Sequence, residues 1–284
     1  MHSKTTILLA FLLLSLAGCD GDHDSAENAG CDPLPVPEAA IGILGPQEDG
    51  SFLGHNGRQA GGIGSSVVLS AVAQGFVAHP VLPLAYVTEY GRDGRQIEVV
   101  DYERGEVVQE VTTVEPHGKA VLSAAGDRLF VPLGTSRRVV SYDVGVDGLL
   151  SEGPSVDVGN RVVALHASAD GSTLWAGLFS EGQLVALDLP SLTERARIPL
   201  RQGAWEILEI ESRHELYISN LVGASIAVVD TNTDSLVANI DIRSSPAGLA
   251  ASSDGSVVWA AISGSDFVVA IDTETREITH HAFV

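Results

Sequence analysis

The sequence has few cysteines and few cations, and both shortages exclude classes of protein. Only two of its 284 residues are cysteines, Cys19 and Cys31, so no disulfide framework can hold the chain together. A chain of this length can bury roughly 70–75% of its unfolded surface and needs no such support. Lysine and arginine number 16, against 37 aspartates and glutamates. The net charge of -21 would repel phosphates, which argues against a nucleic-acid partner.

Familiar enzyme motifs are also missing. The sequence contains no G-x-S-x-G, no H-E-x-x-H, no Walker loop and no C-x-x-C-H motif for haem attachment. The stretch GGIGSS at 61–66 is rich in glycine, but it completes no dinucleotide-binding motif and no βαβ pattern surrounds it. The sequence therefore indicates no cofactor, no metal site and no catalytic residue.

The start of the chain has the pattern of an export signal. Lys4 precedes an apolar run of 11 residues, ILLAFLLLSLA at 7–17, which is too short to cross a bilayer as a stable helix. The residues LAGC at 16–19 resemble a bacterial lipoprotein signal, in which the cysteine becomes the lipidated N-terminus. The resemblance implies that residues 1–18 are removed and that acyl chains on Cys19 anchor the protein in the membrane. Without lipidation, residues 1–18 would be an ordinary secretory signal, and Cys19 could pair with Cys31.

The region after the signal is rich in acidic and small residues and contains proline. We interpret residues 19–39 as a flexible tether, because they hold too little apolar surface to offset the entropy of ordering. Cys31 lies in this tether without a metal-binding or catalytic context, and we expect it to be inert. These features predict a domain held away from a membrane in the bacterial cell envelope, facing the periplasm or the cell surface.

Two markers repeat along residues 75–284. An aromatic residue ends the second apolar run of each unit, with spacings of 44, 45, 42 and 42 residues: Tyr86, Phe130, Trp175, Tyr217 and Trp259. An aspartate ends the third run, with spacings of 42, 45, 42 and 42 residues: Asp101, Asp143, Asp188, Asp230 and Asp272. Periods of 40–50 residues that contain only strand-like segments are typical of β-propeller blades.

The repeated segments have the composition of strands. QLVALD, IAVVD and FVVAID are short, β-branched and apolar on both alternating faces, so each needs cover on both sides, as in a blade between two neighbours. We expect four strands in each unit, called A to D, and in the last unit these are 248–252, 256–261, 267–271 and 276–283. The five aspartates are expected to cap the turn between strands C and D by accepting backbone N–H bonds.

The pattern resembles the YVTN-type β-propeller repeat family, within the lactonase-like propeller group. The resemblance rests on YVTE at 86–89, YISN at 217–220, SSDG at 252–255, and EPHG and SPAG before strand A at 115–118 and 245–248. It covers residues 75–284 and implies an all-β propeller of four-stranded blades. We expect residues 40–284 to form six blades, of which the first, within 40–74, is degenerate. The alternative is five repeats with extra closing strands.

Half of the cations fall in loops that a propeller places on one face. Four lie in loops between strands D and A, namely Lys119, Arg161, Arg201 and Arg243, and four between strands B and C, namely Arg92, Arg95, Arg137 and Arg138. On an acidic protein, such a face would attract anions. His117 sits in a loop at the same face, whereas His79 and His166 belong to different repeat positions and are interpreted as structural. The alternative is that these arginines are ordinary solvated loop residues.

The sequence favours a non-catalytic binding or scaffold module over an enzyme. The expected partners are the membrane, through the lipid, and an unknown protein or small anion at the loop-rich face. A hydrolase of the lactonase-like kind is an alternative that only the family resemblance suggests. A second alternative is an accessory subunit of a periplasmic redox enzyme.

Overall fold

The computed structural model describes residues 45–46, 52–53, 59–60, 67, 69, 72–90, 95–114, 116–265 and 267–283. The signal, the tether with Cys19 and Cys31, the GGIGSS stretch, Arg92 and the side chain of Arg95 lie outside the described residues. The chain divides into two compact units, residues 1–62 and residues 63–284. In the part of the chain described, no helix has the length and apolar character needed to cross a membrane.

The first unit contains a small antiparallel sheet of three two-residue strands, β1 (Gly45–Pro46), β2 (Phe52–Leu53) and β3 (Gln59–Ala60). It falls where the sequence predicts a degenerate first blade. A four-stranded blade is not described there, so the sixth blade stays a prediction.

The second unit consists of five four-stranded antiparallel sheets, each built from four consecutive strands. The first is β4 (Val72–Ala78), β5 (Leu84–Tyr90), β6 (Arg95–Asp101) and β7 (Glu106–Thr112); the second is β8 (Val121–Leu122), β9 (Arg128–Pro132), β10 (Arg138–Val144) and β11 (Leu150–Asp157). The third is β12 (Val162–Ala167), β13 (Thr173–Leu178), β14 (Gln183–Asp188) and β15 (Thr193–Pro199). The fourth is β16 (Ala204–Ile210), β17 (Glu215–Asn220), β18 (Ser225–Asp230) and β19 (Ser235–Asp241), with a 3₁₀ turn, η2 (Glu211–Arg213), between its first two strands. The fifth is β20 (Ser245–Ala251), β21 (Val257–Ser263), β22 (Phe267–Asp272) and β23 (Ile278–Phe283).

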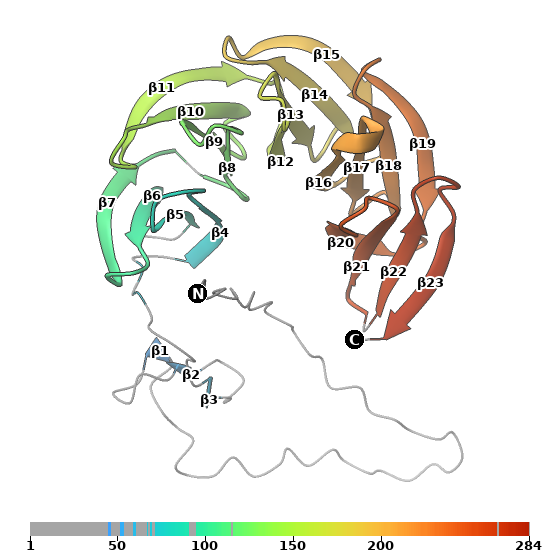
Figure 1. Ribbon diagram of the computed structural model, residues 1–284, viewed down its shortest axis with the longest axis horizontal. Coiled ribbons are helices and arrows are strands. Elements are labelled where there is room, and N and C mark those ends of the chain that lie inside the picture. Colours follow the sequence, from blue (N-terminus) through green and yellow to red (C-terminus); the bar gives the residue numbers. More distant parts are fainter. Residues whose placement is uncertain are drawn as a thin grey trace. The chain divides into compact units, whose positions relative to one another are not determined.

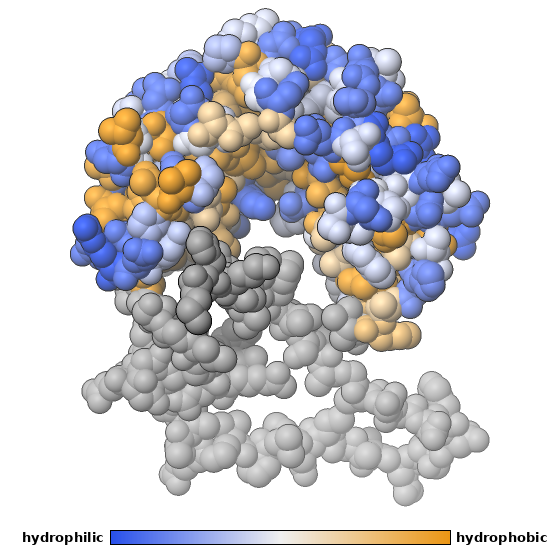
Figure 2. All heavy atoms as spheres, viewed as in Figure 1, coloured by the Kyte–Doolittle hydropathy of each residue, from blue (hydrophilic) through white to orange (hydrophobic). Residues whose placement is uncertain are grey.

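The five sheets follow one another in chain order as the blades of a β-propeller, with the first strand of each sheet on the inner side (Figure 1). The prediction of an all-β fold with four-stranded units is therefore confirmed. The outer strands are polar where they face water: Thr193, Glu194 and Arg195 on β15 are exposed, and hydrophilic residues predominate around this strand in Figure 2.

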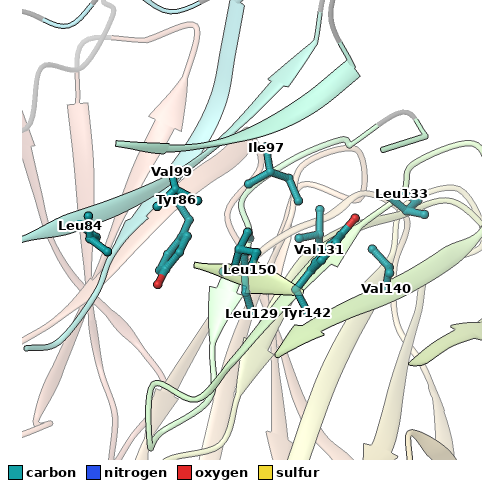
Figure 3. Packing of buried hydrophobic residues seen from close by; sticks show 11 residues of the cluster. Leu84, Tyr86, Ile97, Val99, Leu129, Val131, Leu133, Val140, Tyr142 and Leu150 are labelled. Atoms are coloured by element: carbon teal, nitrogen blue, oxygen red, sulfur yellow. The ribbon is translucent and has the colours of Figure 1, made fainter. Parts of the chain in front are cut away.

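The core consists of apolar clusters, each shared by two neighbouring sheets. Figure 3 shows the first cluster, in which side chains of the first sheet face those of the second: Leu84, Tyr86, Ile97 and Val99 against Leu129, Val131, Leu133, Val140, Tyr142 and Leu150. The Tyr86 hydroxyl also donates a hydrogen bond to the Gly148 carbonyl of the second sheet, at 2.9 Å. A strand that is apolar on both faces is thus covered on both sides, because each blade packs against the next.

The repeated aromatic residue is buried in four sheets and exposed in the fifth. Tyr86, Phe130, Trp175 and Tyr217 are 0–1% exposed, whereas Trp259 is 38% exposed. The first four pack toward the following sheet, as the Tyr217 hydroxyl does when it approaches the Thr273 carbonyl of the fifth sheet. Trp259 belongs to the last of the five sheets of the second unit, and no further sheet of that unit follows it.

The repeated aspartate has two different roles. Asp101, Asp230 and Asp272 each accept two backbone N–H bonds in the following turn, at 2.7 to 3.0 Å, as a turn cap does. Among the described residues, Asp143 and Asp188 instead pair with arginines, Arg128 at 3.3 Å and Arg195 at 2.6 Å. The turns that follow Asp143 and Asp188 are formed in other ways. Asp147 accepts the Leu149 N–H in the second sheet, and the third turn contains a cis Leu189–Pro190 bond.

Candidate functional site

The loops before strand A and between strands B and C lie at one end of the sheets, as the sequence predicts. The Phe179 N–H donates to the Arg161 carbonyl at 2.9 Å, and the Leu200 N–H donates to the Gly182 carbonyl at 2.7 Å. We call this end the DA/BC end and define it by residues 113–114, 116–120, 158–161, 179–182, 200–203 and 221–224. At the opposite end, the Leu189 N–H donates to the Ser172 carbonyl at 2.8 Å.

Arg161 and His117 meet at the DA/BC end. They come from the loops before the third and second sheets, and Arg161 Nη2 lies 2.6 Å from His117 Nε2. A guanidinium can only donate, so His117 Nε2 is the acceptor in this contact. The pairing therefore holds the Arg161 side chain in place.

A glycine allows the His117 loop to approach the third sheet. Gly118 has a φ of +96°, and a Cβ at this position would lie 2.4 Å from the Val163 carbonyl oxygen. An L-residue with a side chain rarely adopts this φ, and the contact would also force the two backbones apart. The sequence PHG at 116–118 thus places an imidazole next to Arg161 through the conformational freedom of the glycine that follows it.

Two aromatic rings extend the site away from Arg161. The guanidinium lies over the Phe179 ring, 5.4 Å from its centroid, in the range of a cation–π contact. Phe179 in turn meets Trp205 of β16 edge-on, with 6.1 Å between ring centroids. Trp205 is 41% exposed. Arg161, Phe179 and Trp205 therefore form a row that ends at water.

Arg161 makes no ion pair within the described part of the chain. Its Nε is buried and has no hydrogen-bond partner among the described residues. Burying one polar group in this way costs roughly 1–3 kcal/mol, so an acceptor that reached the group would stabilise the site. A carboxylate or phosphate matches the donor geometry of a guanidinium.

A second group of charged side chains lies on the inner strands beside this row. Glu206 follows Trp205 on β16, and its carboxyl makes no hydrogen bond among the described residues. Burial raises the pKa of Glu206 above its usual value, and the charges of Lys119 and His166 partly oppose the shift. Glu206 is thus a partly desolvated carboxyl beside two basic groups.

Glu209 and His166 form a hydrogen-bonded pair between the fourth and third sheets. His166 Nε2 donates to Glu209 Oε2 at 3.0 Å, and the Ala169 N–H donates to the same oxygen at 3.0 Å. Burial by itself would raise the pKa of Glu209, but the two hydrogen bonds outweigh it and hold that pKa below its usual value. This pair fixes the orientation of the His166 ring.

The other predicted cations have partners or settings of their own. Arg201 makes an ion pair with Asp241 on β19, and Lys119 lies near Glu206. Arg138 donates to the Ser155 hydroxyl of β11 at 2.6 Å, toward the outer side of its sheet. Arg137 and Arg243 are exposed and have positive φ values of 58° and 62°, which mark them as turn residues. Of the predicted site residues, the structure brings only Arg161 and His117 into contact.

The remaining histidines are structural or exposed. His79 Nδ1 accepts the N–H groups of Val81 and Leu82 at 3.1 and 2.9 Å and thereby shapes a turn. His280 and His281 are exposed neighbours on β23 that pair with different residues of β22. The described residues contain no group of three or more histidine, cysteine, aspartate or glutamate side chains able to hold a metal ion.

Sequence reasoning did not identify Phe179, Trp205, Glu206 and Glu209. Phe179 and Trp205 stand directly beside a predicted BC loop and a predicted DA loop, which was a usable signal. Glu206 and Glu209 interrupt the apolar strand AWEILEI, and charged residues in an inner strand could also have marked the site.

Comparison with known proteins supports the fold but gives no evidence of function. No protein-family model and no curated protein matches the chain. A functionally unknown protein from Desulfotomaculum acetoxidans is similar in structure, with a TM-score of 0.63 and 9% identity, over 74% of this chain and 71% of that one. Virginiamycin B lyase from Staphylococcus aureus gives a TM-score of 0.60 and 14% identity, over 75% and 70% of the two chains.

Hydrazine synthase from Kuenenia stuttgartiensis is similar over a smaller share of its length. The TM-score is 0.53 and the identity 18%, over 61% of this chain and 50% of that chain, so the match spans half the length of the synthase chain. At these identities the likeness concerns the fold alone. The chain is therefore an all-β protein with the blades of a β-propeller and a positioned arginine at the DA/BC end.

Proposed function

We propose that this protein is a lipid-anchored, non-catalytic binding module of the bacterial cell envelope, related to the YVTN-type propeller repeat proteins. Its ligand carries an anionic group, and Arg161 at the DA/BC end binds that group. The observation that carries the proposal is the state of Arg161. Its guanidinium is oriented by His117 and Phe179, lacks an ion-pair partner in the described residues, and has a buried Nε without an acceptor.

The test compares two arginines of the same end that differ in their partners. Binding of succinate and of inorganic phosphate is measured by calorimetry for the wild type, Arg161→Gln and Arg201→Gln. A lost hydrogen bond to a charged group costs about 1.5–3 kcal/mol, so Arg161→Gln should weaken binding by about 10- to 150-fold. Arg201→Gln is the matched control, because Arg201 is already paired with Asp241. Equal affinities for wild type and Arg161→Gln, or no binding by either, would rule the proposal out.

The anchor has its own test. Cells that produce the wild type and Cys19→Ser are fractionated, and the acylation of the N-terminus is examined by mass spectrometry. The wild type is expected in the membrane fraction with an acylated Cys19, and the variant in the soluble fraction. A soluble, unacylated wild type would end the lipoprotein interpretation.

A hydrolase or lyase is the second candidate. It is favoured by the partly desolvated carboxyl of Glu206 near His166 and by the orientation of that ring by Glu209, an arrangement able to move protons. Virginiamycin B lyase, similar in fold, is an enzyme by name. If the wild type converts a bound ligand and His166→Gln does not, the result would favour an enzyme over a protein that only binds.

A further inference from the structure

Trp205 owes its position to a bulge at the start of the inner strand of the fourth sheet. The register between β16 and β17 shifts between Ala204 and Glu206, so Trp205 is the extra residue. The same shift occurs in β12, where the extra residue is Val163, and in β4, where it is Gln74. A bulge redirects the side chain that it carries. In the fourth sheet, that side chain is a large aromatic that contacts Phe179, the ring over which Arg161 lies.

The Trp205 ring is both exposed and supported. Phe179 contacts it edge-on at 6.1 Å, which limits rotation of the indole. An exposed ring held in this way offers a flat apolar surface to a ligand. The binding partner of such a surface is another flat apolar face, and the C–H face of a pyranose ring is one.

Glu206, the residue after Trp205, offers a hydrogen-bond acceptor. Its backbone N–H is bonded to the Ser219 hydroxyl at 3.0 Å, which fixes the residue after the bulge. Its carboxyl is partly buried without a hydrogen bond from a described residue, so it needs donors. Sugar hydroxyls at the rim of a pyranose ring are donors of this kind.

We propose that the DA/BC end binds a short acidic saccharide, with its anionic group on Arg161, a pyranose face on Trp205 and hydroxyls on Glu206. The inference rests on the proposed anion-binding function and adds the class of ligand to it. The ligand is a mono- or disaccharide with one carboxylate or phosphate, because the net charge of -21 repels a long polyanion. A uronic acid and a sugar phosphate share this chemistry, and the binding assays separate them.

The experiment measures affinities for four probes by calorimetry: galacturonate, glucose 6-phosphate, galactose and succinate. One or both acidic sugars should bind at least tenfold more tightly than galactose and succinate. Trp205→Ala should weaken binding of the acidic sugar about tenfold and leave succinate unchanged, and Glu206→Gln should weaken the sugar alone. Trp259→Ala is the matched control, since Trp259 is a similarly exposed tryptophan on the fifth sheet, and it should change nothing.

The outcomes separate this inference from the proposal on which it rests. If succinate binding depends on Arg161 but neither acidic sugar binds more tightly than succinate, the saccharide inference is overturned and anion binding stands. The saccharide inference is likewise overturned, and anion binding stands, if Trp205→Ala and the milder Trp205→Phe both bind the acidic sugar as tightly as the wild type does. If galactose binds as tightly as galacturonate and Arg161→Gln has no effect, anion binding itself is wrong.

Discussion

Trp175 and Trp259 occupy the same position in the third and fifth sheets, each directly opposite an alanine of the neighbouring strand, yet only one is buried. Trp175 is 1% exposed and packs in a cluster with Ile207 and Leu216 of the following sheet. Trp259 is 38% exposed. The difference lies outside the repeat itself, because within the second unit a further sheet follows the third sheet but not the fifth.

This contrast predicts unequal costs for the same substitution. Trp175→Ala should lower the free energy of unfolding by about 3–5 kcal/mol, as the loss of a fully buried aromatic does. Trp259→Ala should cost about 1 kcal/mol or less, because its ring already has access to water. Urea denaturation of both variants measures the difference. Equal costs would mean that the two rings have similar surroundings in solution.

Glu215 links the fourth and fifth sheets and predicts a second stability effect. Its side chain is only 8% exposed, and it accepts from Arg276 at 2.7 Å, from Arg213 at 3.2 Å and from the Tyr217 hydroxyl at 3.1 Å. Glu215→Gln should cost about 2–3 kcal/mol, since it removes the charge that both arginines face and they are themselves partly solvated. The exposed Glu211→Gln is the control and should have almost no effect. A neutral Glu215→Gln in chemical denaturation would contradict this assignment.

Glu206 predicts a pH dependence of stability with a definite sign. Burial raises its pKa in the folded state, so near and above the usual carboxyl pKa the folded protein binds more protons at this site than the unfolded chain does. The stability contributed by Glu206 is therefore present below the unfolded pKa and falls as the pH rises through the folded pKa. Relative to the wild type, Glu206→Gln should gain stability over this window. Thermal unfolding of both proteins from pH 4 to pH 8 tests this prediction. If the wild type becomes more stable relative to the variant as the pH rises, the conclusion is reversed.

Gly118 predicts a coupling between the backbone and ligand binding. Gly118→Ala combines a left-handed φ with a clash against the Val163 carbonyl, and should cost about 1–3 kcal/mol while displacing His117 from Arg161. Gly159→Ala is the control in the next loop, because it has a similar φ of +80° but no atom within 4 Å of a Cβ. Only Gly118→Ala should weaken anion binding when both variants are measured in the folded state. If both variants bind equally well, His117 does not position Arg161.

Local sequence patterns predicted the blades well, for a physical reason. Alternating apolar residues and turn residues act between neighbours in the chain, so the hairpins around Asp230 and Asp272 follow from their own segments. The predicted last unit, with strands near 248–252, 256–261, 267–271 and 276–283, lies within a few residues of β20 to β23. The serine–aspartate turns also depend only on residues close together in the chain. Ser168 donates to Asp170 and Ser252 donates to Asp254, each at 2.6 Å.

The candidate site depended on contacts between different sheets, which a single repeat does not contain. Arg161 and Arg201 occupy equivalent loops, but one meets His117 and Phe179 whereas the other meets Asp241. Within a sheet, too, identical positions differ: Asp143 and Asp188 match the other aspartates in sequence, yet arginines of neighbouring strands in their own sheets bind their side chains.

The sequence by itself determined the strands, their turns and their fourfold grouping, because those rest on interactions within about 42 residues. Only the tertiary structure decided which cation meets His117 and Phe179 and which aromatic is covered, because both depend on the neighbour that each blade meets.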